Sequence, residues 1–163
     1  MADTKISALT AITGANTATD DVFSIVDTSV TTTKKITRAE LKIALGVTAS
    51  STFTATLTGC TTSPTVTASY SVTNGIVTVY YPTASATSNT TAMTITGAPA
   101  AIQPTTAKSV FPCVITDNGT AANSAASVGT DGVVTLFATS GGGAFTASGT
   151  KGHSGMTLTY DLT

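Results

Sequence analysis

A chain of 163 residues has room for one domain with a short appendage. A net charge of −1, with only 9% of residues charged, excludes attraction to nucleic acid or to an anionic membrane through overall charge. No apolar run approaches the ~20 residues that a membrane helix needs, and no apolar signal core follows residues 1–5. We therefore expect a soluble protein made in the cytoplasm, with threonine and serine supplying most of its polarity.

Charge divides the chain into two parts. Residues 1–45 hold ten of the fifteen charged side chains, whereas residues 46–163 hold the other five. A shift of composition marks a domain boundary, and Gly46 with the Thr- and Ser-rich stretch 48–52 can serve as a linker. The sequence therefore predicts an N-terminal arm over 1–45 and a separate domain over 46–163.

The arm carries one strand pattern and one helix start. The strand pattern covers residues 22–26 and ends in Asp27. Thr37 and Glu40 have the spacing of a capping box, and Gly46 stands where a left-handed residue follows the end of a short helix. One strand and so short a helix cannot make a core. We expect the arm to pack on something else: its own domain, a symmetry mate or another protein.

The C-terminal domain alternates apolar and polar residues with a period of two, which is typical of half-buried strands. Residues 53–57 place apolar side chains on one face and threonines on the other. Asn74 and Gly75 then form the strongest short hairpin signal in the chain. A two-residue turn at this point pairs Val72 with Val77, so that apolar side chains meet on the same face.

Further strand patterns continue to the C-terminus. Residues 93–95 mark a short strand, and a three-residue loop ending at Gly132 predicts a hairpin that pairs Val128 with Val134. Residues 156–162 alternate again. About eight strands separated by turn signals predict an all-β fold, a single antiparallel β-sandwich for which a jelly-roll order is favoured.

The segment 110–115 differs from the other strands because it is apolar on both faces. Pro112 cannot donate a hydrogen bond to a ladder, so we expect a sheet edge or a bulge there. An edge strand with two apolar faces suggests a subunit interface, and a central strand covered by loops is the other interpretation. The candidate interface residues, two of them from the polar face of the predicted hairpin, are Ile76, Tyr80, Phe111, Cys113 and Ile115.

Titratable side chains are too scattered to predict an active site. His153 is the only histidine and falls in a loop-like run. Asp117, in the run Asp-Asn-Gly, and Asp131, in the pair Asp-Gly, are explained better by turn formation than by calcium binding or glycoside hydrolysis. Cys60 and Cys113 with one histidine cannot form a structural zinc site, and we expect free thiols, with a later disulfide left open. We predict no enzyme activity, no metal and no cofactor.

Three blocks near the N-terminus, residues 5–9, 22–29 and 33–41, carry a resemblance. In this order, KISAL, VFSIVDTS and TKKITRAEL resemble the opening module of tailed-bacteriophage structural proteins, found in head fibres, tail fibres and other appendages. The sequence departs from that pattern at Phe23-Ser24, where Leu-Pro is common. The resemblance implies that the arm attaches to the particle, and the candidate docking residues are Ile6, Leu9, Val22, Phe23, Ile25, Lys34, Lys35, Ile36 and Leu41.

The sandwich is also similar to C-terminal knobs of phage fibre and decoration proteins, through residues 69–79 and 128–132. The resemblance implies a non-enzymatic virion protein at the capsid surface, a head fibre or cement protein that decorates or stabilises the capsid. The implied partners are further copies of the chain, with trimers frequent, the phage major capsid protein and other virion proteins, but neither nucleic acid nor a membrane. The alternative is a short tail fibre or receptor-binding protein that recognises a host-surface glycan through Tyr80, Tyr81 and Phe145.

Overall fold

The computed structural model describes residues 22–27, 32–37, 41 and 50–163. The chain divides into two compact units, Met1–Val47 and Thr48–Thr163. In the first unit β1 (Val22–Asp27) pairs antiparallel with β2 (Thr32–Thr37), with Phe23 opposite Ile36. The sequence predicted β1 but not β2, because TTKKIT contains a single apolar residue and shows no alternation. Leu41 is helical, and the other residues of the helix expected after Thr37 lie outside the described part of the chain.

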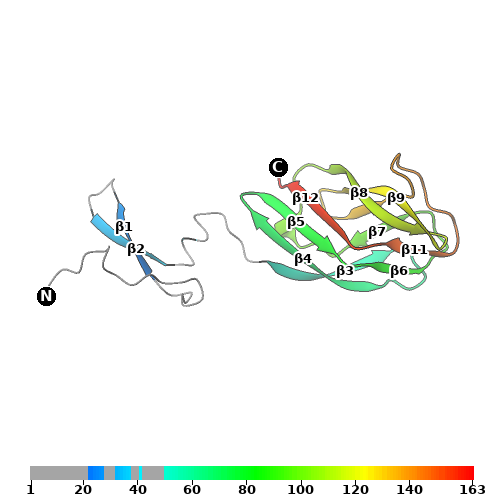
Figure 1. Ribbon diagram of the computed structural model, residues 1–163, viewed down its shortest axis with the longest axis horizontal. Helices are drawn as coiled ribbons and strands as arrows, with labels where there is room; N and C mark the ends of the chain where they lie inside the picture. Colours follow the sequence, from blue (N-terminus) through cyan, green and yellow to red (C-terminus); the bar gives the residue numbers. More distant parts are fainter. Residues whose placement is uncertain (1–21, 28–31, 38–40, 42–49) are drawn as a thin grey trace. The chain divides into compact units, whose positions relative to one another are not determined.

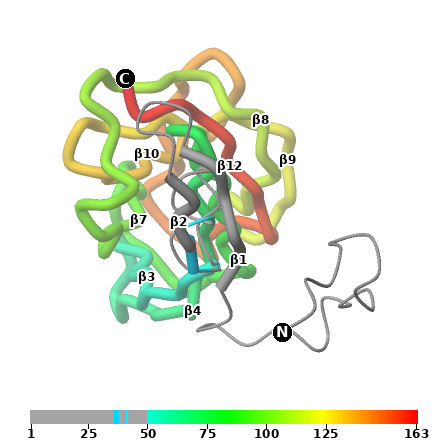
Figure 2. The backbone as a smooth tube through the Cα atoms, turned by 90° about the vertical axis from the view of Figure 1, so that its left-hand side faces the viewer, coloured from blue at the N-terminus to red at the C-terminus, as the bar shows by residue number. Residues whose placement is uncertain are grey.

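The second unit is a ten-stranded antiparallel sheet that curls on itself (Figures 1 and 2). The order of strands across the sheet is β12-β5-β4-β3-β7-β10-β9-β8-β11-β6, and its two halves face each other across one core. The all-β antiparallel sandwich expected from the sequence is confirmed. Its strand order contains two meanders, β3-β4-β5 and β8-β9-β10, which distinguish it from a jelly roll. The strands are β3 (Ser51–Thr58), β4 (Thr65–Thr73), β5 (Ile76–Tyr81), β6 (Ala84–Thr87), β7 (Met93–Thr96), β8 (Lys108–Asp117), β9 (Thr120–Val128), β10 (Val134–Leu136), β11 (Thr150–His153) and β12 (Met156–Asp161).

Both hairpins predicted from turn chemistry are confirmed. Asn74 and Gly75 have φ angles of 51° and 77°, as a type I′ turn requires, and Val72 is opposite Val77. Gly132 has a φ of 75°, and Val128 is opposite Val134. Each register places the apolar side chains of neighbouring strands on the core face together.

The core follows directly from the period-two alternation. Every second residue of β5 and β12 is buried, and the residues between them are exposed. Each fully buried leucine or valine contributes roughly 1.5–3 kcal/mol relative to an exposed one. The largest buried apolar side chains are those of Leu57, Val77, Val79, Tyr81, Met93, Ile95, Ile102, Ile115, Val128 and Leu158.

A long two-stranded ribbon closes one side of the sandwich. Tyr81 is opposite Met156 in the β5–β12 pair, and Ala84 is opposite His153 in the β6–β11 pair. These two pairs share one continuous register across the break at residues 82–83 and 154–155, where Gly155 N donates to Thr83 Oγ1 at 3.0 Å. One half of the ribbon pairs with β4 and the other half with β8, so the ribbon passes from one layer to the other.

The sequence predicted about eight strands in this unit and missed β6 and β11. Their sequences, ASAT and TKGH, contain no alternating large apolar residues. Their place in the sheet comes from pairing within the ribbon and not from an amphipathic pattern. No helix in the described residues is long and apolar enough to cross a membrane.

Candidate functional site

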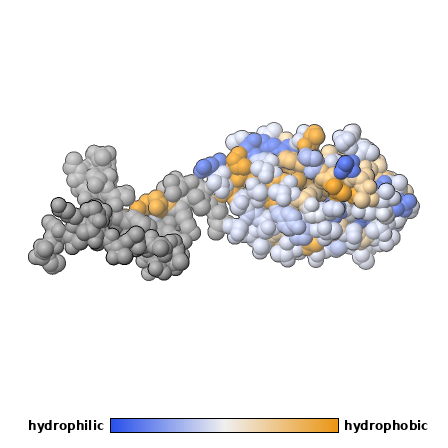
Figure 3. Space-filling model, in the orientation of Figure 1, coloured by the Kyte–Doolittle hydropathy of each residue, from blue (hydrophilic) through white to orange (hydrophobic). Residues whose placement is uncertain are grey.

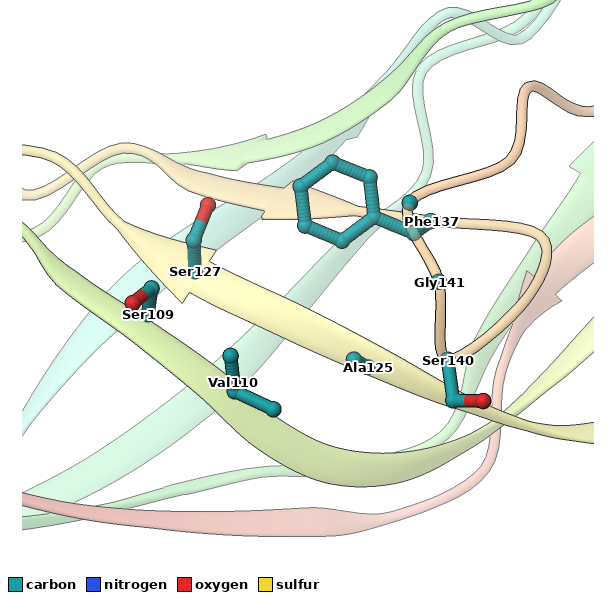
Figure 4. A pocket seen from close by; sticks show the side chains of 8 residues that line it. Ser109, Val110, Ala125, Ser127, Phe137, Ser140 and Gly141 are labelled. Atoms are coloured by element: carbon teal, nitrogen blue, oxygen red, sulfur yellow. The ribbon is translucent and has the colours of Figure 1, made fainter.

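An open groove with a volume of about 350 Å³ lies on the outer side of β8 and β9 (Figure 4). Figure 4 shows Ala125 and Ser127 between the Phe137 ring on one side and Val110 on the other. The loop that follows Phe137 completes the rim. The lining residues are Ser109, Val110, Ala125, Ser127, Phe137, Ser140, Gly141 and Gly142.

Hydrogen bonds fix the wall that Phe137 forms. Phe137 N donates to Ala125 O at 3.1 Å, and Ser124 Oγ donates to Phe137 O. The loop beyond it closes on itself, since Gly142 N donates to Thr139 O and Gly143 N donates to Thr139 Oγ1, both at 3.0 Å. The rim of the groove is therefore held by hydrogen bonds within the protein itself.

A β-bulge between Lys108 and Phe111 forms the opposite rim. Val110 lies in this bulge with a φ of +67° and with 70% of its surface exposed. A β-branched residue in the left-handed region is strained by roughly 1–2 kcal/mol, and burial does not compensate Val110 for it. Strained residues and bulges are enriched at functional sites, which makes this rim a candidate for function.

Replacing Val110 with glycine tests the strain. Val110→Gly removes the left-handed penalty and loses almost no buried surface, so we expect the free energy of unfolding to rise by about 1 kcal/mol. A valine-to-glycine change in an ordinary strand lowers it. Chemical denaturation measures the difference, and Val114→Gly on the same strand is the matched control, expected to be destabilising. A Val110→Gly protein less stable than the wild type would show that Val110 is not strained.

The outer face of β4, β5 and β12 is a second candidate surface. Ile76 and Tyr80 are 44% and 46% exposed, and hydroxyl-bearing side chains surround them. Figure 3 shows that most of the sandwich surface in that view is near neutral in hydropathy, with isolated apolar patches. The residues of this face are Ser69, Ser71, Thr73, Ile76, Thr78, Tyr80, Thr157, Thr159 and Asp161.

The candidate interface residues of β8 face the interior of the sandwich. Phe111, Cys113 and Ile115 pack into the core of their own sandwich, and Ile115 is fully buried. The alternation of the strand turns them toward this core, and their part in a subunit interface stays a prediction. The face that β8 exposes instead carries Val110, Pro112 and Val114.

Pro112 lies at a position where its missing N–H group costs the sheet little hydrogen bonding. β8 pairs with β9 along most of its length but with β11 only at residues 115–116. Among the described strands, its first half therefore has no ladder partner on one side, and this half contains Pro112 and the bulge. The edge and bulge expected at Pro112 are therefore present, although β8 as a whole lies inside the sheet order.

The aromatic residues proposed for glycan stacking are mostly unavailable. Tyr81 and Phe145 are both buried in the core, and only Tyr80 is exposed. Sequence reasoning missed Phe137, which follows β10 outside any alternating pattern and reaches the surface groove. The signal that could have found it is the glycine-rich stretch 141–143, which begins four residues after it, because such loops allow an open rim.

His153 lies in β11 and is 2% exposed, so the loop expected around it is wrong. Its Nδ1 is 2.8 Å from Ser154 O and serves as the donor, since a carbonyl oxygen only accepts. Its Nε2 is buried without a hydrogen-bond partner in the described part of the chain. Burial holds the pKa of His153 below its ordinary value of 6.5, against the opposing effect of the Ser154 carbonyl.

This lowered pKa makes the sandwich sensitive to mild acid. The unfolded chain takes up the proton at a higher pH than the folded chain, so stability falls as the pH drops below about 6.5. His153→Asn keeps a donor near the Nδ1 position and does not titrate. We expect the melting temperature of the wild type to fall more than that of His153→Asn between pH 7.5 and pH 5. Equal losses in the two proteins would contradict a neutral buried histidine.

Lys151 is fully buried, and its side chain links β11 to neighbouring loops of the sandwich. Its Nζ donates to Thr90 O, and Ser88 Oγ lies 3.4 Å away. Ser88 Oγ and Thr90 Oγ1 both donate to Gly59 O, so Lys151 ties β11 to two loops. These contacts explain how the sandwich accommodates a buried ammonium group.

The cysteines are both free thiols, Cys60 half-buried and Cys113 buried. Burial raises the pKa of each, and for Cys60 the charge of Lys151 partly opposes this. Within residues 22–27, 32–37, 41 and 50–163, no cluster of His, Cys, Asp or Glu has the arrangement of a metal site. Asp131 has the turn role expected of it, since its Oδ1 accepts a hydrogen bond from Val133 N at 3.0 Å.

The candidate docking residues lie in the first unit. Val22, Phe23 and Ile25 belong to β1, whereas Lys34, Lys35 and Ile36 belong to β2. Ile36 and Leu41 are half-buried. Ile6 and Leu9 lie outside the described residues.

Comparison with known proteins identifies no family for the chain. No protein-family model matches it, and no curated protein sequence matches it. Among solved structures, the reovirus attachment protein sigma1, in complex with alpha-2,3-sialyllactose, is similar with a TM-score of 0.47 and 14% identity. The match covers 98% of this chain and 85% of that chain. Similarity this low carries no argument about function.

Proposed function

We propose that the protein is a non-enzymatic structural protein of a tailed-phage particle, docked through residues 1–45. On this proposal it decorates or stabilises the capsid, as a head fibre or cement protein, and exposes its sandwich at the capsid surface. Its partners are two further copies of the chain in a homotrimer, the major capsid protein and other virion proteins that adjoin it.

The observation that carries this proposal is the separation of a short unit from a complete sandwich. The division falls between Val47 and Thr48, and the three phage-like blocks all lie before it. The sandwich has its own closed core and needs nothing from the first unit to bury its apolar side chains. An attachment unit joined to a self-sufficient knob is the arrangement that particle decoration requires.

The surface of the sandwich also suits this role. Its charged side chains are few, and Lys108 is paired with Asp161 at 2.5 Å. A face with few charged side chains avoids most of the cost of desolvating charges when a neighbouring subunit covers it. Ile76 and Tyr80 stay available for such a contact, with Val110 and Val114 as additional apolar positions.

Adding purified protein to particles that lack it tests the proposal. We expect saturable co-sedimentation with capsids and none with detached tails. Binding to tails alone would favour the alternative, a receptor-binding tail protein. The groove beside Phe137 supports this alternative, because an exposed pocket without charged side chains can bind a host-surface sugar.

A further inference from the structure

We propose that the groove between Val110 and the 139–142 loop binds one residue of a neutral glycan. The groove belongs to the sandwich alone, so the inference goes beyond particle docking and applies to a capsid or a tail location alike. Three properties of the lining carry it: size, a division into apolar and hydroxyl-bearing parts, and the absence of charge.

The size fits a single sugar ring. The volume of about 350 Å³ is at the lower end of the roughly 300–1,000 Å³ of small-molecule sites. The groove is open to solvent along one side, so a chain continuing from the bound ring has a way out. A long polymer would extend over the neighbouring strands instead of filling the groove.

The chemistry of the lining matches the two sides of a sugar ring. A pyranose has a face of C–H groups and an edge of hydroxyl groups. Phe137 and Ala125 supply apolar surface for the first, and Ser109, Ser127 and Ser140 supply hydroxyl groups for the second. Each serine hydroxyl both donates and accepts, as sugar hydroxyls do. None of these three hydroxyl groups is hydrogen-bonded to another described residue.

The absence of charge selects neutral sugars. No acidic or basic side chain among the described residues lines the groove. Lys108, next to Ser109 in the chain, is already engaged by Asp161 and by Thr163 O. An acidic sugar would bring a carboxylate into the groove without a cation to bind it, which favours the neutral counterpart.

The rim is fixed before binding, which lowers the cost of ordering it. Thr139 holds the loop through two hydrogen bonds, and the bulge holds Val110 in place. A rigid rim loses little conformational entropy when a ligand binds.

The competing occupant is an apolar side chain of another protein. It would cover the Phe137 wall, but it would also cover three serine hydroxyls without giving them partners. Covering hydroxyl groups in this way is unfavourable. The lining therefore favours a ligand that carries its own hydroxyl groups.

Saturation-transfer NMR on the full-length chain tests the proposal. The probes are the methyl glycosides of glucose, galactose, mannose and N-acetylglucosamine, with methyl glucuronide and methyl galacturonide as charged counterparts. We expect at least one neutral glycoside to bind, and its acidic counterpart to bind at least ten-fold more weakly. No binding by any neutral probe, or stronger binding by an acidic one, would overturn the proposal.

Variants locate the binding. A Cβ added at Gly141 would have no atom within 4 Å, so Gly141→Leu adds a bulky side chain to the rim of the groove without a backbone clash. Ser109→Ala and Ser127→Ala together remove two hydroxyl groups. We expect each change to weaken binding at least ten-fold at an unchanged melting temperature, whereas Tyr80→Ala on the other face leaves binding unchanged. Loss of binding with Tyr80→Ala but not with Gly141→Leu would place the site elsewhere and contradict the inference.

A protein occupant has its own signature in the same experiments. If a second copy covers the groove, NMR shifts at Phe137 and Ser127 change with protein concentration alone, and Gly141→Leu shifts the oligomeric state. This outcome would replace the sugar site with a subunit contact. Failure of the particle-docking proposal is separate, because it depends on residues 1–45 and leaves sugar binding untouched.

Discussion

A protein that lacks residues 1–45 is expected to fold normally and to lose its attachment to particles. The sandwich over 48–163 keeps its complete core and ribbon closure, so its melting temperature should stay within a few degrees of that of the full chain. Co-sedimentation with particles that lack the protein measures attachment. We expect binding to fall below detection at concentrations that saturate with the full chain.

The reciprocal protein is the control for this deletion. Residues 1–47 fused to an unrelated soluble carrier should bind the same particles and compete with the full chain. If the sandwich alone still decorates bare capsids, the assignment of docking to the arm is wrong. If neither part binds alone, attachment needs both units, and the arm is not a sufficient docking module.

Replacing Gly152 with alanine is expected to be the most damaging single change in the ribbon. A Cβ at Gly152 would lie 2.1 Å from Ala84 O and 2.6 Å from Ser85 Cα, so the two backbones would have to separate. Overpacking against backbone costs about 3 kcal/mol. For a domain of this size we expect the melting temperature to fall by about 10 °C.

The matched control for this change is Gly141→Ala. Its Cβ has open space, and Gly141 is not in the left-handed region, so the free energy of unfolding should change by less than about 0.5 kcal/mol. Calorimetry on both proteins measures the difference. A Gly152→Ala protein as stable as Gly141→Ala would show that β6 and β11 are not held in close contact.

The parts of the fold that the sequence predicts are those set by local rules. The Asn74–Gly75 turn has one favoured geometry, and the alternation on both sides of it fixes the register. The burial of Met156, Leu158 and Tyr160 follows from the same period. In these strands the alternation of apolar side chains determines which residues pair, so the register can be predicted from the sequence.

The ribbon could not be predicted because long-range pairing determines it. β6 and β11 contain alanine, glycine and two buried polar residues, Lys151 and His153. The sequence around these polar residues is typical of a loop and does not reveal the hydrogen bonds that Lys151 Nζ and His153 Nδ1 make in the folded domain. Burial of Tyr160 raises its pKa to about 12, and its hydroxyl donates to Ile102 O at 2.7 Å, which is another partner that the sequence does not reveal.

The groove was beyond sequence reasoning for a related reason. The strand containing Val110 was recognised, but the bulge that turns Val110 outward depends on the register of β8 against β9. Phe137 follows β10 outside any alternating pattern, and its hydrogen bonds with Ser124 and Ala125 hold it at the rim of the groove. The sequence therefore singled out the β8 strand but did not show that Val110 and Val114, and not Phe111, Cys113 and Ile115, are its exposed apolar residues.

The number of copies in purified particles tests the central claim most directly. Quantitative mass spectrometry against the major capsid protein gives this number. The proposed decoration role predicts a copy number comparable to that of the capsid protein or a large fixed fraction of it. A handful of copies would contradict decoration and favour the tail receptor-binding alternative, and complete absence from particles would contradict both.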